Sequence, residues 1–465
     1  MYTAICKNIY YPFLDRSKRM RFGQALWDAQ RNQDLSPEQL RMLQVRKLQT
    51  ILKHAENNCP YYAETYRKQS AKAADVSSPE DIRCFPLLGK EDVFNRREDM
   101  VTPLHKGKVF RGTTSGSTGM AMSFYYDSAH AAWVEACQWR GRWWWGLERG
   151  DPQLVLWARP AEQSWKAEFA TWLKYRLRNC IQFNTFHEFN DKKIAAILAA
   201  LRRFCPKLIY GYGSSIGRLA EGLAAHNETL TPEERPLLVE YTADHMEEAE
   251  QRTAAAVFGA PIVSAYGASE CGGIAQQCRL GRLHVSVDHV LLEFLRADGS
   301  AADEDETAEI VVTSLNNFAM PLIRYRVGDL GSFSSDKCPC GINLPVMTLQ
   351  AGKAVDLITT SARSAISAHL LDYINLYLMK HGIRGIKQFF VEQTSRDAFV
   401  LSIVQDTPFD ERSVQVFVEK MKGYLGEHIE VNTKFVESIP LQPSGKRRYF
   451  KKSFYHDSRT CSAGS

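Results

Sequence analysis

The sequence lacks the long apolar runs and the one-sided charge that mark membrane-spanning and nucleic-acid-binding proteins. Nothing in its 465 residues approaches the roughly 18 consecutive apolar residues that a spanning helix requires. Charged residues, Lys7, Asp15 and Arg16 among them, interrupt the N-terminal region where a signal peptide needs an apolar core. The net charge of +5, from 58 basic and 53 acidic residues, permits anionic ligands but predicts neither nucleic acid nor a membrane as partner. A cytoplasmic protein is therefore expected.

Cysteine, glycine and proline are too sparse for the protein classes that depend on them. The 11 cysteines are too dilute for a disulfide scaffold, and 29 glycines with 18 prolines lie near average usage. Hydrophobic residues make up 45% of the chain, which excludes a disordered protein. At roughly 100–200 residues per domain, the length predicts a globular protein of two or three domains.

The hydrophobic pattern divides the chain into three regions. Residues 1–110 are expected to be mostly helical, with Ser36 capping a long helix. Further on, β-rich runs (LVLWA, KLIYGYG, PIVSAYG, EIVVTSL) alternate with helical stretches (KKIAAILAALRRF, EEAEQRTAAAVFG), which predicts an α/β domain with substantial parallel sheet. After Gly352, the runs KQFFVEQ, AFVLSIV and RSVQVFVEKMKGYL predict a small α+β lid. The expected domains are thus 1–351, with mixed sheets and helices, and 352–465.

The segment RGTTSGSTG, residues 111–119, has the composition of a phosphate-binding loop. Its glycines let backbone N–H groups approach an anion closely, and neighbouring hydroxyls supply further donors. The segment lacks the GxxxxGK[ST] spacing of a Walker loop, so no P-loop fold is implied. A polar hairpin turn is the alternative interpretation.

Three further segments place one charged residue beside a glycine turn. Glu270, in SAYGASE, follows the apolar run AAAVFGAPIV, interpreted as a strand; a strand-end carboxylate suits Mg²⁺ unless it is merely solvated. Asp329, in IRYRVGDLG, could accept both hydroxyls of a ribose or simply cap a turn. Lys446, in IPLQPSGKRR, lies on a glycine-containing loop and could stabilise phosphate transfer, or be a solvated tail residue.

One group of cysteines is clustered. Cys278 and His284 precede the turn Cys338-Pro-Cys340-Gly341, whose two sulfurs should point toward one centre. Cys₃His is a common structural zinc set, and a full set leaves no open position for catalysis. Cys271 is an alternative ligand, although a metal bound there would crowd the neighbouring Glu270. The other alternative is that the four residues bind no metal.

The order of these motifs carries a resemblance that no single motif does. TSGSTG, YGASE, YRVGD and a C-terminal SGK together resemble the adenylate-forming acyl/aryl-CoA synthetase superfamily. HAENNCPYY, FPLLGKEDV, KLIYGYGSS and MPLIRYRVGDL make the chain similar to its phenylacetate–CoA ligase branch, especially capsule-polysaccharide-biosynthesis relatives. Those relatives also have a Cys and His after YG-x-x-E and a later C-P-C-G.

The resemblance implies an ATP-dependent ligase with a mobile C-terminal lid. A carboxylic acid, aryl or acyl, would become acyl-AMP with release of pyrophosphate, and the thiol of coenzyme A would then displace AMP. The lid would rotate between the two steps on a hinge near residues 352–356. The resemblance implies that the loop over the ATP phosphates consists of Thr114, Ser115, Gly116, Ser117, Thr118 and Gly119, and that Tyr266 and Gly267 lie near the adenine. It implies that Glu270 holds Mg²⁺, that Asp329 and Lys353 bind the ribose, and that Lys446 contacts the acid and the α-phosphate. The residues implied along the acid pocket are Phe183, Tyr210 and Tyr212.

Two departures from the family pattern leave the acceptor open. Lys353 occupies the position where the superfamily usually has Arg. A lysine keeps the positive charge but lacks the planar guanidinium group that can bind both ribose hydroxyls. The following AVDLITTSARSAIS lacks the usual glycine-containing loop of the thioester-forming state. Coenzyme A is the expected acceptor, and an amine, a sugar or a carrier-protein thiol are the alternative acceptors. A second alternative function is a non-catalytic binding protein with the same fold. A homodimer is also possible from the sequence. Trp139 and Trp143–Trp145 form either a pocket wall or helix packing.

Overall fold

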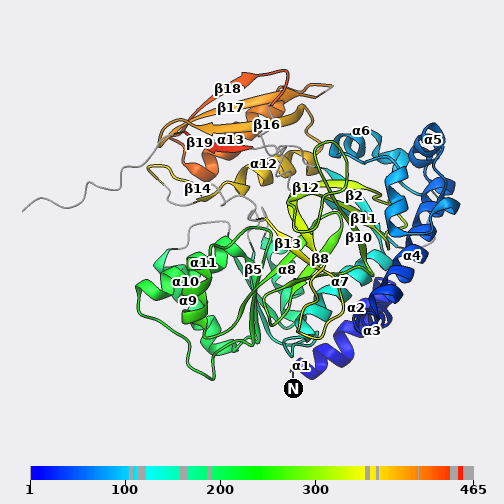
Figure 1. Ribbon diagram of the computed structural model, residues 1–465. Helices are drawn as coiled ribbons and strands as arrows, with labels where there is room; N and C mark the ends of the chain where they lie inside the picture. Colours follow the sequence, from blue (N-terminus) through cyan, green and yellow to red (C-terminus); the bar gives the residue numbers. More distant parts are fainter. Residues whose placement is uncertain are drawn as a thin grey trace, which may run out of the picture. The chain divides into compact units, whose positions relative to one another are not determined.

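The computed structural model describes residues 2–103, 108–113, 122–157, 165–185, 190–350, 357–362, 366–406, 408–439 and 449–453. These residues form two compact units, which Figure 1 colours along the chain from blue to red. The larger unit holds nearly all described residues up to Gln350, and the smaller unit holds those from Leu357 onward. The expected boundary after residue 351 falls within 351–356, outside the described residues.

An 11-stranded sheet forms the centre of the larger unit. Its order is β10-β11-β12-β13-β9-β8-β7-β6-β5-β3-β4. The neighbours from β4 to β7 pair in parallel, and the neighbours from β7 to β10 pair antiparallel, so the expected α/β class with a mixed sheet is confirmed. The strands are β3 (Gln153–Trp157), β4 (Cys180–Asn184), β5 (Leu208–Tyr212), β6 (Leu238–Thr242), β7 (Ile262–Ala268), β8 (Gly272–Gln277), β9 (Leu283–Val285), β10 (Val290–Leu295), β11 (Ala308–Ser314), β12 (Tyr325–Ser334) and β13 (Val346–Leu349).

The N-terminal region is helical, as the sequence predicts. Ser36 caps α4 by accepting the backbone N–H of Gln39, whose side chain accepts the N–H of Ser36 in return. The helical segments are α1 (Tyr2–Ile5), η1 (Cys6–Tyr10), α2 (Tyr11–Ser17), α3 (Phe22–Asn32), α4 (Pro37–Asn58), α5 (Pro60–Gln69), η2 (Ala73–Asp75), η3 (Pro79–Cys84) and α6 (Lys90–Met100). A two-stranded sheet follows, made of β1 (Val109–Thr113) and β2 (Ser123–Asp127).

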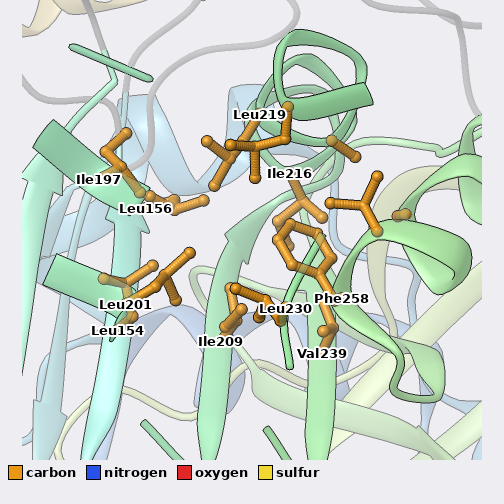
Figure 2. Close-up of a cluster of buried hydrophobic side chains, with 14 of the residues drawn as sticks. Leu154, Leu156, Ile197, Leu201, Ile209, Ile216, Leu219, Leu230, Val239 and Phe258 are labelled. Atoms are coloured by element: carbon orange, nitrogen blue, oxygen red, sulfur yellow. The ribbon is translucent and has the colours of Figure 1, made fainter. Parts of the chain in front are cut away.

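Helices cover both faces of the parallel strands, because successive strand residues point to opposite faces. Figure 2 shows one face, where Leu156, Ile209 and Val239 pack against the helices α9, α10 and α11. On the other face, Leu208 and Leu238 pack against α3 and α7. The helices between the strands are α7 (Ser128–Trp143), α8 (Trp165–Leu177), α9 (Asp191–Phe204), α10 (Gly213–Ala225) and α11 (Glu248–Phe258).

The apolar run AAAVFGAPIV is not one strand, so that expectation is wrong. Its first part ends α11 at Phe258, and β7 begins only at Ile262. Gly259 separates them with a φ of +61°, a left-handed conformation in which glycine commonly ends helices. The strand that leads to Glu270 is therefore shorter than predicted, but it still ends beside the YG turn.

The smaller unit is the α+β structure that the sequence predicts. Phe389 and Phe417, both fully buried, join its sheet to a helix with ring centroids 5.1 Å apart. The four-stranded sheet has the order β18-β17-β16-β19. Its elements are β14 (Leu357–Ile358), β15 (Ile366–Ser367), α12 (His369–Lys380), β16 (Ile386–Gln393), β17 (Ala398–Gln405), α13 (Arg412–Leu425), β18 (Glu430–Phe435) and β19 (Phe450–Lys452). In the described parts of both units, no helix is long and apolar enough to cross a membrane.

Candidate active site and metal cluster

Two motifs far apart in the sequence meet through a pair of hydrogen bonds. Tyr266 lies in β7, Glu270 lies in the turn between β7 and β8, and Tyr325 and Asp329 belong to β12. The hydroxyl of Tyr325 donates to Glu270 Oε1 at 2.8 Å, and the hydroxyl of Tyr266 donates to Asp329 Oδ2 at 3.1 Å. The structure therefore brings Tyr266, Glu270 and Asp329 together in one site.

Burial fixes the direction of both hydrogen bonds. Tyr266, Glu270 and Tyr325 are buried, while Asp329 is half-buried. Burial, and then the facing carboxylate, raises the pKa of each phenol well above its ordinary value, so both hydroxyls keep their protons. An ionised carboxylate has about four acceptor positions, so one phenol leaves capacity for a cation or a hydroxyl ligand.

Gly267 lets the β7–β8 turn close tightly. A Cβ atom at this position would lie 2.5 Å from the carbonyl oxygen of Gly272, closer than real contacts allow. The glycine is thus required by the close approach of the two strands. This structural requirement exists whether or not Gly267 also faces a nucleotide.

The start of β12 is anchored by a buried ion pair that the sequence did not reveal. Arg324, at a φ of +52°, contacts Glu293 at 2.8 and 3.0 Å and donates to the carbonyl oxygen of Phe85 at 2.6 Å. Its backbone N–H donates to Thr313 Oγ1 at 2.9 Å. These contacts position the adjacent Tyr325.

Sequence reasoning also missed Tyr325 itself. One signal was present, since Tyr325 alternates with the exposed Arg326 and so marks an inward position of the strand. Its partner Glu270 lies 55 residues earlier, and no local spacing connects the two.

The predicted cysteine–histidine cluster is assembled from the β8–β9 turn, strand β9 and the segment between β12 and β13. The ligand atoms of Cys278, His284, Cys338 and Cys340 all lie within 4.8 Å of one another. Cys278 Sγ and Cys338 Sγ are 3.7 Å apart, and Cys340 Sγ lies 3.3 Å from His284 Nε2. Two sulfurs on one tetrahedral zinc would be about 3.8 Å apart at Zn–S distances of about 2.3 Å. The donor set and its spacing therefore fit a tetrahedral metal.

The surroundings of His284 orient its ring toward the cluster. Its Nδ1 lies 2.8 Å from the carbonyl oxygen of Leu344, so Nδ1–H donates there and Nε2 faces the sulfurs. Burial lowers the pKa of His284, which favours the neutral ring that a metal needs. Trp144 packs edge-on to the ring at 5.7 Å. Cys271, the alternative ligand, is not part of this group.

The three residues expected along an acid pocket do not share one face of the sheet. Tyr210 and Tyr212 contact the ring of Trp157, with centroids 5.7 and 4.4 Å away. Phe183 pairs in register with Leu156 and packs against the apolar cluster on the opposite face of the sheet. Strand alternation explains the separation, so Phe183 does not join the two tyrosines.

The tryptophan tract serves packing rather than one common wall. Trp139 is buried against α3, and Trp143 is 47% exposed. Trp144 and Trp145 donate their indole N–H groups to Gln33 and to a backbone carbonyl.

The remaining predicted site residues, Thr114–Gly119, Lys353 and Lys446, lie outside the described residues.

Comparison with known proteins agrees with these motifs. Residues 358–453 match the CapK C-terminal domain family. Protein CapK of Staphylococcus aureus is 22% identical over 419 residues, which cover 88% of this chain and 88% of CapK. A phenylacetate-coenzyme A ligase of Pseudomonas putida is 26% identical over 310 residues, covering 63% of this chain and 67% of that enzyme.

A solved structure shows the same fold. The crystal structure of 2-hydroxyisobutyryl-CoA ligase in complex with 2-HIB-AMP and CoA matches with a TM-score of 0.58 and 17% identity, covering 91% of this chain and 92% of that one. The resemblance seen in the motifs is thereby confirmed. These similarities support placing the chain in the adenylate-forming superfamily, near the phenylacetate–CoA ligases and CapK.

Proposed function

We propose that the chain is an AMP-forming acid–thiol ligase for an aryl or acyl carboxylic acid, with coenzyme A as acceptor. The supporting observation is the pair of carboxylates, Glu270 and Asp329, each held by a buried phenol at the position of a family motif. The ligases among its relatives, and the neighbour crystallised with an acyl-AMP and CoA, support the same chemistry.

In the first step, a carboxylate oxygen of the acid attacks the α-phosphorus of ATP, and the bond to pyrophosphate breaks. Magnesium, when bound, would neutralise charge on the phosphates, and Glu270, oriented by Tyr325, would hold it. Asp329 would accept hydrogen bonds from the ribose hydroxyls, and Lys353 would donate one to a ribose oxygen. The loop Thr114–Gly119 would bind the phosphates through its N–H groups. Lys446 would stabilise the charge that develops on the α-phosphate.

In the second step, the thiol sulfur attacks the acyl carbon and the bond to AMP breaks, while the thiol proton leaves to solvent. The aromatic group formed by Trp157, Tyr210 and Tyr212 is our candidate for the acid side of the site. Phe183 is left out of it because of its position on the opposite face.

We assign zinc to Cys278, His284, Cys338 and Cys340. The metal would act as a structural staple, because four protein ligands leave no open coordination position. The cluster is surrounded by Val346, Ile342 and Trp144, an apolar setting that suits a structural site.

A pyrophosphate-release screen over aryl, fatty and amino acids, with and without coenzyme A, tests the proposal. We expect release with a limited set of acids, and a product of acyl-CoA mass when coenzyme A is present. Acyl-AMP that accumulates while coenzyme A stays free would replace the thiol ligase by an enzyme with an amine, sugar or carrier-protein acceptor. No release with any acid would contradict adenylation itself.

A further inference from the structure

Helix α8 presents a row of large apolar side chains to solvent. Trp165 is 75% exposed, Trp172 is 57% exposed and Phe169 is 54% exposed, and the last two rings stack at 5.5 Å. Leu173 and Leu177 continue the row at helical spacing, and none of the 13 residues of α8 is buried. A soluble protein rarely exposes so many contiguous large apolar groups without a partner.

The N-terminal helices extend this surface. The hydroxyl of Tyr2 donates to the carbonyl oxygen of Arg176 at 2.6 Å, and Cys6 Sγ lies 3.5 Å from the carbonyl oxygen of Leu177. The N-terminal segment therefore lies against the C-terminal end of α8. Exposed apolar residues recur along it at four-residue spacing: Ile5, Ile9 and Phe13.

Basic residues are concentrated in the same two segments. Residues 2–21 and 165–178 contain nine basic and two acidic residues, a net charge of +7, whereas the chain as a whole carries +5. The basic residues are Lys7, Arg16, Lys18, Arg19, Arg21, Lys166, Lys174, Arg176 and Arg178. Lys7 pairs with Glu148, and the acidic Asp15 pairs with Arg149. The overall charge conceals this concentration, which is why composition predicts no membrane partner.

Three of these cations lie close enough to repel one another. Partial desolvation, and then the charge of Arg178, lowers the pKa of both Lys18 and Lys174. Arg178 also has a buried Nε atom without a hydrogen-bond partner among the described residues. A cluster of like charges with an unsatisfied donor is a site that an anion would stabilise.

We infer that the face formed by α8 and the helices of residues 2–17 docks on an anionic lipid surface. The exposed indole and phenyl rings would enter the boundary between headgroups and acyl chains, and the lysines and arginines would bind lipid phosphates. This combination of Trp, Phe and Leu with Lys and Arg is typical of helices that lie in a membrane interface.

A second copy of the chain fits this face less well. Homodimers use the same patch on both subunits, so this face, with five basic and two acidic residues in 2–17 and 165–177, would meet another face with the same net positive charge. Like charges placed against each other are unfavourable unless anions intervene. An anionic bilayer supplies the opposite charge.

Co-sedimentation of the full chain with vesicles tests the inference. Vesicles of phosphatidylcholine mixed with phosphatidylglycerol should bind the protein, and vesicles of phosphatidylcholine alone should bind it much less. Trp165→Ser combined with Trp172→Ser should lower partitioning about tenfold or more. Lys166→Glu combined with Lys174→Glu should lower it about 25-fold or more, and added salt should have the same direction of effect.

Exposed residues elsewhere provide matched controls. Trp27→Ser, at a site that is 52% exposed on α3, and Lys53→Glu on α4 should bind vesicles as the unchanged protein does. Equal melting temperatures would show that all variants are folded. The inference is overturned if the protein does not bind anionic vesicles, or if the α8 variants bind them as strongly as the unchanged protein does. A dimer that Trp172→Ser dissociates, without vesicle binding, would assign the face to a second copy instead.

Discussion

The hydroxyl of Tyr325 donates a 2.8 Å hydrogen bond to Glu270 Oε1, with both side chains buried. Tyr325→Phe removes only this hydroxyl and leaves the carboxylate oxygen without that donor, at a cost of about 1–3 kcal/mol. If Glu270 holds magnesium, pyrophosphate release should fall about tenfold, and the magnesium concentration that gives half-maximal activity should rise. Both are measured by titrating magnesium with one competent acid.

Tyr66→Phe is the matched control for this variant. Tyr66 is also fully buried, and its hydroxyl has no hydrogen-bond partner in the part of the chain that the structure describes. Removing it should leave activity and magnesium dependence unchanged. A Tyr325→Phe protein that behaves in the same way would contradict the positioning role of Tyr325.

The elements of the fold were predictable because their signals are local. The apolar spacing of KKIAAILAALRRF matches α9, and LVLWA and KLIYGYG match β3 and β5. The run AAAVFGAPIV was interpreted in two ways: as one strand, and as a helix end in EEAEQRTAAAVFG followed by the strand of PIVSAYG. The structure confirms the second interpretation, and Gly259, in a left-handed conformation, ends the helix.

The candidate site was predictable residue by residue but not as contacts. Glu270 and Asp329 stood out as charged residues beside glycine turns, whereas their phenol partners depend on how β7 and β12 are placed in the sheet. Phe183 was grouped with Tyr210 because the acyl pocket of the family is lined from the corresponding strand and loop regions. Register puts them on opposite faces, and composition does not encode register.

If zinc occupies the cysteine–histidine cluster, the purified protein should contain the metal. Protein purified without chelator should contain about one zinc per chain. Cys338→Ser should remove it and lower the melting temperature, since a buried ligand of the staple is lost. Cys84→Ser changes an exposed cysteine and should keep both zinc and melting temperature. Metal analysis that finds no zinc in the unchanged protein would rule out the assignment.

Lys446 should act in adenylation more than in thiol transfer. Loss of one charged group that stabilises the transition state costs about 10²-fold in rate. Lys446→Ala should therefore slow acyl-AMP formation by about that factor, while transfer from supplied acyl-AMP to coenzyme A changes much less. Lys451→Ala, in β19, removes a cation five positions later in the sequence that contacts Glu392, and it should affect neither step strongly. Equal losses in both steps would refute the role of Lys446.

Two buried histidines predict a loss of stability in mild acid. The rings of His130 and His289 lie 5.3 Å apart, and both are buried. Burial, then the neighbouring His289, lowers the pKa of His130 to about 3, and burial lowers the pKa of His289 to about 4. His289 is held as a neutral ring, since Nε2–H donates to the carbonyl oxygen of Cys271 and Nδ1 accepts from the amide of Asn316.

The direction of the effect follows from proton uptake on unfolding. An unfolded histidine binds a proton near its ordinary pKa of about 6.5, whereas the folded pair stays neutral down to about pH 4. The unfolded chain therefore holds more protons below pH 6.5. The free energy of unfolding should fall as the pH drops from about 6.5 toward 4, by up to about 1.4 kcal/mol per pH unit for each histidine.

Urea denaturation between pH 7 and pH 5 measures this slope. His130→Gln removes one of the two protonation sites, so its free energy of unfolding should fall less steeply with decreasing pH, even if it starts from a lower value. His226→Gln, at a side chain that is 51% exposed, is the surface control, and its slope is compared with that of the unchanged protein. Identical slopes for all three proteins would show that burial of His130 does not control acid stability.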